Sequence, residues 1–291
     1  MPTQIAELIP KLPEPVRALP RSAIWTYGRL TSAIRPLPTA LIIGAQKAGT
    51  TALYAWLRRH PVVVGPSWKE VNYFDRRYAR GEAWYRGHFP NELRLRRIRN
   101  AGFEPVVLEA TPGYLFHPLA PQRVRDLIPE ARLIALVRSP VGRAYSHYQH
   151  EVALGREPLS FEDALEAEAG RMEGELERML ADPAYFSYAW WNYTYQARGL
   201  YAEQLERWRA VFLEEQLLVV PTEDLAQSPA ETYARVLAHI GAPPHELGEY
   251  PPVYVRDYAE MPPEARARLS EYFAEPNRRL EDLLGRKLGW T

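Results

Sequence analysis

The sequence has no cysteine, no net charge and no long apolar run, and each absence excludes a class of protein. Without cysteine, the 291-residue chain can form neither a disulfide framework nor a thiolate metal site. The 36 basic and 36 acidic side chains cancel, so no global charge favours a nucleic acid or an anionic membrane as a partner. No apolar run reaches the ~20 residues that span a bilayer, and the N-terminus lacks the basic-then-apolar order of a signal peptide. We therefore expect a soluble, cytoplasmic protein without a membrane span, in which any anion site comes from a local cluster.

Prolines divide the chain into an arm and a domain. They recur along residues 1–38, for example at Pro10, Pro15 and Pro36, and forbid a long helix there. We expect residues 1–38 to form an arm on the surface and residues 39–291 to form one domain.

After residue 39, short apolar and β-prone runs alternate with helical stretches. Helical patterns at 121–128, 140–153 and 195–214 separate most of these runs. Such alternation predicts an α/β fold of the P-loop type, a parallel sheet flanked by helices on both faces. Ligands of such sheets bind beyond the carboxyl ends of the strands. The predicted strands are 39–44, 62–65, 105–110, 132–137 and 216–221.

Two further stretches are best explained by packing. Residues 157–181 are rich in Glu and Ala with interleaved Leu and Met, which predicts a solvated amphipathic helix; a cation-binding face is the alternative. Residues 185–195, YFSYAWWNYTY, concentrate aromatic side chains. Core packing is the simpler interpretation, and a wall that binds an acceptor is the alternative.

The first predicted strand leads into a glycine-rich turn of the phosphate-binding kind. Residues 41–63 read LIIGAQKAGTTALYAWLRRHPVV, in which Gly44 and Gly49 keep the Walker spacing. Thr50 and Thr51 open a helix that we expect to continue through His60, where Pro61 stops it. Backbone N–H groups and the positive helix end then face an anion. A Walker lysine follows the second glycine, whereas Lys47 lies between the two. Lys47 could neutralise charge on the oxygen that bridges a 5′-phosphate to a leaving group. The alternative is a plain turn with a surface lysine.

The stretch LIALVRSPVGRAYSHY (133–148) provides a second candidate anion contact. Arg138 lies at the carboxyl end of a strand, and Ser139 is a plausible N-cap before Pro140. Ser146 lies two helical turns further on. Arg138 and Ser146 could together bind a second phosphate, the arginine through charge-assisted hydrogen bonds.

The stretch SWKEVNYFD (67–75) provides a candidate base. Lys69 and Glu70 follow the second predicted strand, where a carboxylate could accept the proton of an attacking hydroxyl. An exposed Lys–Glu pair is the alternative. Among the histidines, His147 beside Ser146 is the competing base.

In combination, these three stretches resemble the sulfotransferases that use 3′-phosphoadenosine 5′-phosphosulfate (PAPS). The resemblance is greatest to the heparan sulfate N- and 3-O-sulfotransferase branch, and it extends from about Pro38 to Trp290. Further segments in family order are RGLYAEQLERW (198–208), LVVPTEDLAQSP (218–229) and EYFAEPNRRLEDLLGRKLGW (271–290).

The resemblance implies a role for each matching residue. Residues 47–51 would hold the 5′-phosphosulfate, with Lys47 at the bridging oxygen, and Glu70 matches the catalytic carboxylate. No metal is required, because PAPS lacks the β/γ-phosphate pair that magnesium bridges. The residues that would bind the donor are Lys47, Ala48, Gly49, Thr50, Thr51, Arg138, Ser146 and, as a basic contact to the 3′-phosphate, Arg256.

The chain departs from the heparan pattern at two positions near the predicted acceptor. Asn72 replaces a histidine two residues after the glutamate, and Ala110 in EATPGYLF replaces the lysine of EKTPAYF. The resemblance therefore implies the donor and leaves the acceptor open. It is a hydroxyl or amine of a carbohydrate, a glycolipid or a small metabolite.

Two other functions stay open at this point. A P-loop kinase acting on ATP would need a strand-end carboxylate for magnesium, for which Glu109 and Glu223 are available. A nucleotide-binding scaffold without turnover would keep the donor site alone.

Overall fold

A five-stranded parallel sheet forms the centre of the protein. The structure is a computed structural model, and it describes residues 21–251 and 259–290. The strand order is β2-β3-β1-β4-β5, and every neighbouring pair is parallel. The strands are β1 (Ala40–Gly44), β2 (Val63–Val64), β3 (Val106–Ala110), β4 (Arg132–Val137) and β5 (Leu217–Pro221).

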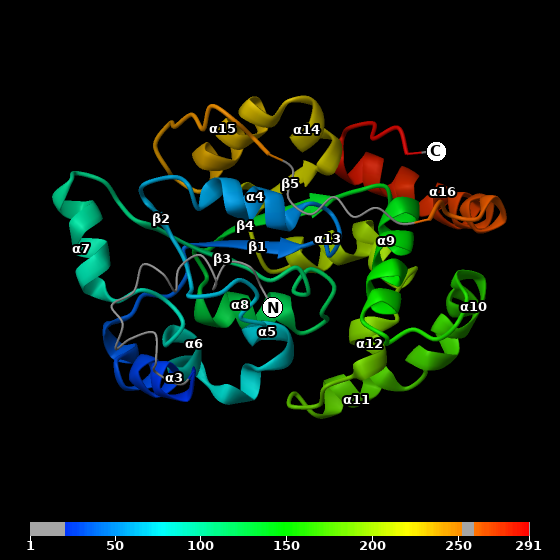
Figure 1. The fold of residues 1–291 in the computed structure, drawn as a ribbon, viewed down its shortest axis with the longest axis horizontal. Coiled ribbons are helices and arrows are strands. Elements are labelled where there is room, and N and C mark those ends of the chain that lie inside the picture. Colours follow the sequence, from blue (N-terminus) through cyan, green and yellow to red (C-terminus); the bar gives the residue numbers. More distant parts are fainter. Residues whose placement is uncertain (1–20, 252–258, 291) are drawn as a thin grey trace.

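The strands form where short apolar runs are buried on both faces. All residues of β1 and β3 are buried, because helices cover each side of the sheet. Figure 1 shows α4 (Thr50–Leu57), α14 (Thr222–Gln227) and α15 (Pro229–His239) above the strands and α8 (Ala120–Leu127) below them. The predicted α/β fold is confirmed.

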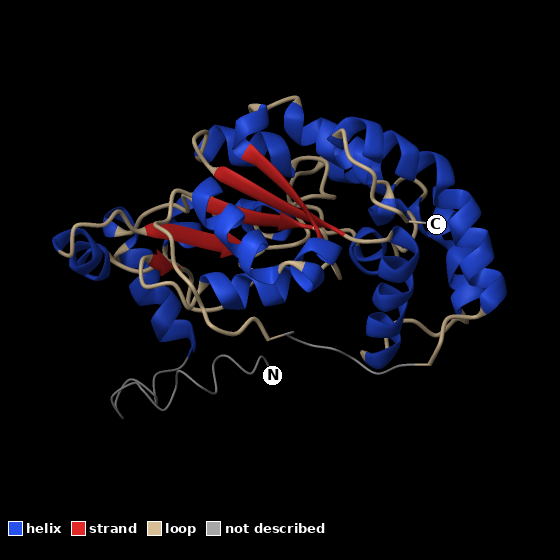
Figure 2. Cartoon of the chain, turned by 90° about the horizontal axis from the view of Figure 1, so that it is seen from above, coloured by secondary structure: helices blue, strands red, loops and turns tan. Residues whose placement is uncertain are grey.

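A second group of helices lies beyond the carboxyl ends of the strands (Figures 1 and 2). Its own apolar cluster includes Ala144, Leu165 and Phe273, all buried. These helices enclose the edge of the sheet at which ligands of such folds bind. The group consists of α9 (Pro140–Ala153), α10 (Phe161–Met172), α11 (Glu175–Ala181), α12 (Tyr188–Asn192), α13 (Tyr201–Arg209), α16 (Pro263–Leu284) and the 3₁₀ turn η4 (Ala197–Gly199).

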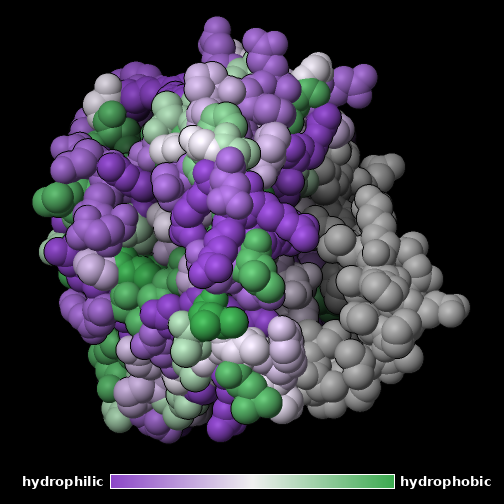
Figure 3. All heavy atoms as spheres, turned by 90° about the vertical axis from the view of Figure 1, so that its left-hand side faces the viewer, coloured by the Kyte–Doolittle hydropathy of each residue, from purple (hydrophilic) through white to green (hydrophobic). Residues whose placement is uncertain are grey.

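The opposite end of the molecule carries α3 (Arg21–Leu30), η2 (Ser32–Ile34) and α7 (Glu92–Asn100). Its surface is mainly hydrophilic, with apolar side chains in small groups (Figure 3). A shallow groove of about 440 Å³ between η2 and α7 includes the exposed Ile34 and Leu93. The remaining short elements are α5 (Tyr73–Arg76), η3 (Tyr78–Arg80), α6 (Glu82–Arg86) and η5 (Glu214–Gln216).

Three helices differ from the sequence-based expectation. The helix that starts at Thr50 ends at Leu57 and does not continue to His60, the residue before Pro61. The stretch 195–214 is broken into η4 and α13. The stretch 157–181 is two helices separated at Gly174. It is less solvated than predicted, because the buried Glu168 accepts hydrogen bonds from the backbone amides of Gln196 and Ala197.

None of the helices described between residues 21 and 290 is long and apolar enough to cross a membrane. Residues 1–20 of the predicted arm lie outside the described residues, so the division into an arm and a domain stays a prediction.

Candidate active site at the carboxyl edge of the sheet

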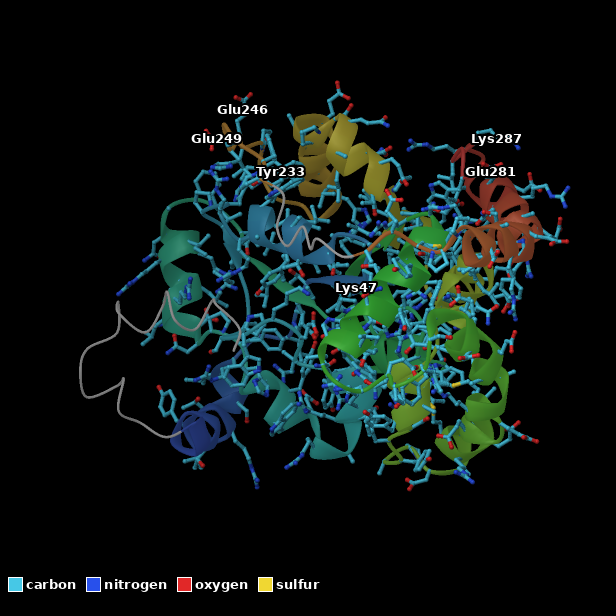
Figure 4. All side chains as sticks on the ribbon, turned by 45° about the vertical axis from the view of Figure 1, so that its right-hand side comes forward. Lys47, Tyr233, Glu246, Glu249, Glu281 and Lys287 are labelled. Carbon is cyan, nitrogen blue, oxygen red and sulfur yellow. The ribbon has the colours of Figure 1, made fainter. Side chains whose placement is uncertain are left out.

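The glycine-rich turn leads from β1 into α4 as predicted. Lys47 and Gly49 both have left-handed backbone conformations, with φ of 69° and 88°. Glycine adopts such a conformation freely, whereas for Lys47 it costs of order 1–3 kcal/mol, so the surroundings must hold the loop. The first amides of α4 have no partner within the helix and face the loop opening. Figure 4 shows Lys47 near the middle of the molecule, between the start of α4 and α9.

Side chains from the two following strands hold this loop. Arg138, directly after β4, donates from Nη1 to the Lys47 carbonyl at 3.3 Å. Thr222, directly after β5, donates its hydroxyl to the Ala48 carbonyl at 2.8 Å and to that of Val137 at 3.0 Å. The carboxyl ends of β1, β4 and β5 are thereby bonded into one surface.

The helix that follows Arg138 begins as predicted, but without the expected capping bond. Ser139 occupies the N-cap position and Pro140 the first helical position of α9. The Ser139 side chain makes no capping hydrogen bond to any described amide. Its hydroxyl therefore does not contribute the stabilisation that a serine cap usually gives.

Ser146 lies in the second turn of α9, the helix that follows Arg138. It is 8% exposed, and its neighbour His147 is fully buried. Burial, and then the positive charges of Arg143, Arg198 and Lys47, hold the pKa of His147 well below its usual value. The ring packs edge-to-face on Tyr195. His147 is therefore a neutral packing residue, and its burial keeps it from an acceptor.

Glu70 follows β2 in the chain and lies beside the end of β3, the strand next to β1. Its amide donates to the carbonyl of Ala110, the last residue of β3, at 3.1 Å. Because β3 and β1 are neighbours, Glu70 and the Lys47 loop share one edge of the sheet. The Glu70 side chain is 45% exposed, and Oε1 lies 2.6 Å from Nζ of Lys69. The carboxylate is thus accessible and paired with a cation.

The residues after Glu70 turn sharply. Glu70 and Asn72 have φ of 65° and 55°, and asparagine tolerates this conformation better than most residues. Nδ2 of Asn72 donates to the Glu70 carbonyl at 2.6 Å. Oδ1 of Asn72 is buried and has no hydrogen-bond partner among the described residues. Asn72 thus stabilises the turn that presents Glu70.

An arginine and aromatic side chains lie beside Glu70. The Arg76 guanidinium is 4.4 Å from the ring centre of Phe186 and 4.5 Å from that of Trp191. Burial lowers the pKa of Arg76, and the charge of Arg156 lowers it further, while Asp75 and Glu70 oppose the shift. Two residues of the aromatic stretch 185–195 thus pack on an arginine whose pKa is influenced by the charge of Glu70. Tyr195, in contrast, is fully buried, as core packing predicts.

Arg256 lies outside the described residues, so its predicted contact stays a prediction. The residues that flank 252–258 are bonded to α4 on one side and to α9 on the other. Nε1 of Trp56 in α4 donates to the Pro251 carbonyl at 3.0 Å. The Tyr145 hydroxyl in α9 donates to the Ala259 carbonyl, also at 3.0 Å.

The two carboxylates that a kinase could use for magnesium differ in their contacts. Glu109 is fully buried and accepts hydrogen bonds from Thr111, Tyr114 and Tyr85. Oε1 of Glu223 accepts one from Nε1 of Trp290 at 2.9 Å, and its Oε2 has no hydrogen-bond partner among the described residues. Within residues 21–251 and 259–290, no group of three or more His, Asp and Glu side chains is arranged to hold a metal ion.

Sequence reasoning missed two features of this site. Thr222 follows β5 directly, so the same strand-end rule that singled out Arg138 indicates it as well. The three hydroxyls on Glu109 come from different segments, and no sequence spacing indicates that they converge.

Comparison with known proteins identifies the family. A family model, described as the sulfotransferase domain, matches residues 37–250. The chain belongs to the sulfotransferase domain family. It is similar to a sulfotransferase from Alicyclobacillus acidocaldarius, with 32% identity and a TM-score of 0.62, over 87% of this chain and 98% of that one.

Curated relatives include both types of heparan sulfate sulfotransferase. Human heparan sulfate glucosamine 3-O-sulfotransferase 6 is 30% identical over 88% of this chain and 74% of that protein. Mouse bifunctional heparan sulfate N-deacetylase/N-sulfotransferase 4 is 29% identical over 98% of this chain. This sulfotransferase spans only 35% of the length of the bifunctional enzyme. The predicted family, fold and enzyme class are confirmed, and the kinase hypothesis is set aside.

Proposed function

We propose that this sulfotransferase transfers the sulfuryl group of PAPS to a hydroxyl or amine of a carbohydrate or small-metabolite acceptor. The observation that supports this most directly is the arrangement at one sheet edge. A phosphate loop with an internal lysine follows β1, Arg138 follows β4, and an accessible Glu70 lies at the end of β3. Together they offer a cradle for a donor anion and a base beside it.

The donor would bind along the β1 and β4 ends. The amides of residues 48–51 would face the 5′-phosphosulfate, and Lys47 would stabilise the charge that develops on the bridging oxygen. Arg138 and Ser146 would contact the 3′-phosphate, which distinguishes this donor from a simple adenylate. Because PAPS has no β/γ-phosphate pair, none of these contacts needs a metal ion.

Transfer would proceed in line. The acceptor oxygen or nitrogen attacks sulfur from the side of Glu70, and the S–O bond to the 5′-phosphate breaks as the new bond forms. Glu70 accepts the proton of the acceptor, and adenosine 3′,5′-bisphosphate (PAP) leaves. Lys69, 2.6 Å from Glu70, would orient the carboxylate.

Glycan acceptors are supported by the names of the heparan sulfate relatives and by the rim beside Glu70. Arg76 with Phe186 and Trp191 offers both charge and aromatic faces. Ala110, however, is fully buried at the end of β3 and supplies no cation where the heparan pattern has lysine. The acceptor class is therefore best determined with a panel of compounds.

The test is transfer from ³⁵S-labelled PAPS to heparan sulfate, de-N-sulfated heparan sulfate, a glycolipid and 4-nitrophenol. We expect labelled product with at least one of them. We expect Glu70→Gln to lower kcat by ~10²–10⁴ while PAP affinity stays within about twofold, since the base acts only during transfer.

Glu82→Gln is the matched control, because Glu82 is also an exposed glutamate paired with a neighbouring cation, Arg86 at 2.5 Å. It should keep full turnover. Near-normal turnover of Glu70→Gln would remove Glu70 from its role. Tight PAP binding without transfer to any acceptor would favour the silent scaffold.

A further inference from the structure

The Glu70 turn is held by a buried hydrogen-bond relay. Glu109 in β3 is fully buried, and its Oε1 accepts hydrogen bonds from the hydroxyls of Thr111 and Tyr114, both at 2.7 Å. Each hydroxyl in turn accepts a backbone amide of the turn. The Asn72 amide donates to Thr111 Oγ1 at 3.3 Å, and the Tyr73 amide donates to the Tyr114 hydroxyl at 2.9 Å.

The direction of these bonds is fixed by chemistry. A backbone amide can only donate, so the single proton of each hydroxyl must point away from it and toward Glu109. Oε1 of Glu109 accepts both protons at once. Glu109 therefore orients the two hydroxyls as acceptors for the turn.

The turn needs this support because its conformation is unfavourable. Glu70 and Asn72 both have left-handed φ values, and each costs of order 1–3 kcal/mol for a residue with a side chain. The Glu70 amide donates to the carbonyl of Ala110, the residue after Glu109. Residues 70–73 are thus bonded to one short segment, 109–114.

We infer that Glu109 is a positioning residue for catalysis: through the Thr111 and Tyr114 hydroxyls it holds the turn that aims Glu70 at the acceptor. Glu109 itself has no exposed surface and does not touch substrate. The inference rests on the proposed role of Glu70 as the base. A misplacement of about 1 Å in a reacting group can cost ~10²-fold in rate, so loss of the relay should lower kcat rather than donor affinity.

The two tyrosines on Glu109 provide a matched pair of variants. Both are fully buried and both donate to the carboxylate, Tyr114 to Oε1 and Tyr85 to Oε2. Of these two tyrosines, only Tyr114 is described as accepting a backbone amide of the turn, that of Tyr73. Tyr85 meets Tyr73 by ring stacking at 4.4 Å, which phenylalanine preserves. Tyr114→Phe and Tyr85→Phe therefore remove the same group, but only the first breaks the relay.

We expect Tyr114→Phe to lower kcat at least 10-fold with KM for PAPS and PAP affinity unchanged within about twofold. Amide hydrogen exchange at Tyr73 should become at least 10-fold faster, because its acceptor is gone. Tyr85→Phe should keep kcat and Tyr73 exchange within about twofold of the unaltered protein, even if its unfolding temperature falls.

Thr111 provides a rescue test on the other branch. Thr111→Val deletes the hydroxyl and should lower kcat like Tyr114→Phe, whereas Thr111→Ser keeps Oγ and should restore most of it. A purely structural role would instead make kcat of the folded protein equal in Tyr114→Phe, Thr111→Val and Thr111→Ser.

The outcomes separate this inference from the proposed function. Equal kcat and equal Tyr73 exchange in Tyr114→Phe and Tyr85→Phe would overturn the relay while leaving the sulfotransferase intact. Failure of the unaltered protein to transfer label from PAPS to any of the four acceptors (heparan sulfate, its de-N-sulfated form, a glycolipid and 4-nitrophenol) would count against the proposed function. In that case, faster amide exchange at Tyr73 in Tyr114→Phe than in Tyr85→Phe would still support the relay. Equal exchange in the two variants would overturn it.

Discussion

Two buried carboxyl groups near the Glu70 turn, those of Glu109 and Asp75, differ in their hydrogen-bond partners. Glu109 accepts three hydroxyl protons, which oppose the rise in its pKa that burial causes. Asp75 accepts one hydrogen bond, from the Arg76 amide at 2.7 Å, and its Oδ2 has no partner in the described part of the chain. Burial raises the pKa of Asp75 to about 7, with the charge of Glu109 adding to the shift. Asp75 is thus a proton-binding group near neutral pH.

This pKa predicts a pH dependence of stability. Unfolded Asp75 would lose its proton near pH 3.8, whereas the folded protein keeps it to about pH 7. The folded state binds more protons between these values, so the free energy of unfolding falls as pH rises from about 4 to 7. At 1.36 kcal/mol per pKa unit, this loss amounts to roughly 4 kcal/mol.

Asp75→Asn removes the ionisable group and should remove this loss. Urea unfolding should show the variant gaining stability relative to the unaltered protein as pH rises from 5 to 8. Asp126→Asn, at an exposed helical position, is the control and should show no such trend. A stability difference for Asp75→Asn that is flat across this range would contradict the assignment.

At the scale of elements, the site is made where strands end. Gly44, the last residue of β1, has no space for a side chain: a Cβ there would overlap Leu115. Leu115 is 1% exposed, and its amide bonds to the Ile43 carbonyl at 2.7 Å, so it cannot move aside easily. The first glycine of the loop is therefore required by packing, beyond any contact with phosphate.

We expect Gly44→Ala to lower the free energy of unfolding by about 1–3 kcal/mol, the usual cost of overpacking a core. Gly170→Ala is the matched control. Gly170 lies within α10 with open space around its Cα, and alanine favours a helix by up to about 1 kcal/mol. Chemical denaturation of both variants measures the difference. If Gly44→Ala were as stable as Gly170→Ala, the packing argument would be wrong.

The sequence predicts where strands and helices begin better than it predicts which strands pair with one another. β4 has the expected bounds, and the start of α4 at Thr50 follows from the loop pattern. Strand order depends on pairings such as Ile42 with Ala110, which are far apart in the chain and leave no local pattern. The early end of α4 and the breaks in two other predicted helices are set by tertiary contacts, which override propensity.

For the candidate site, the sequence predicts the residues that follow strands but not the hydrogen bonds that join distant segments. Lys47, Arg138 and Glu70 follow strands, so the rule that ligands bind at the carboxyl edge finds them. The bonds of Thr222 to Ala48 and of Glu109 to two hydroxyls join distant segments, and only a structure shows them.

At the scale of the whole molecule, a chain without net charge gathers cations at one edge of its sheet. Besides burial, the positive charges of Arg143, Arg198 and Lys47 lower the pKa of His147 in α9. Glu151 and Glu168 offset part of this positive charge. The attraction of the cations for an anion weakens with salt. Arg138 and the first turn of α4 follow the neighbouring strands β4 and β1, so the two phosphates of the proposed donor would lie on adjacent strand ends.

The most direct test of the central claim, that the Lys47 loop and Arg138 form a site for a doubly phosphorylated adenosine, is calorimetric titration at one ionic strength. PAP, adenosine 5′-monophosphate and magnesium-ATP are compared on the same protein. We predict that PAP binds at least 100-fold more tightly than either of the others. Tight binding of magnesium-ATP, with no measurable heat from PAP, would contradict the account.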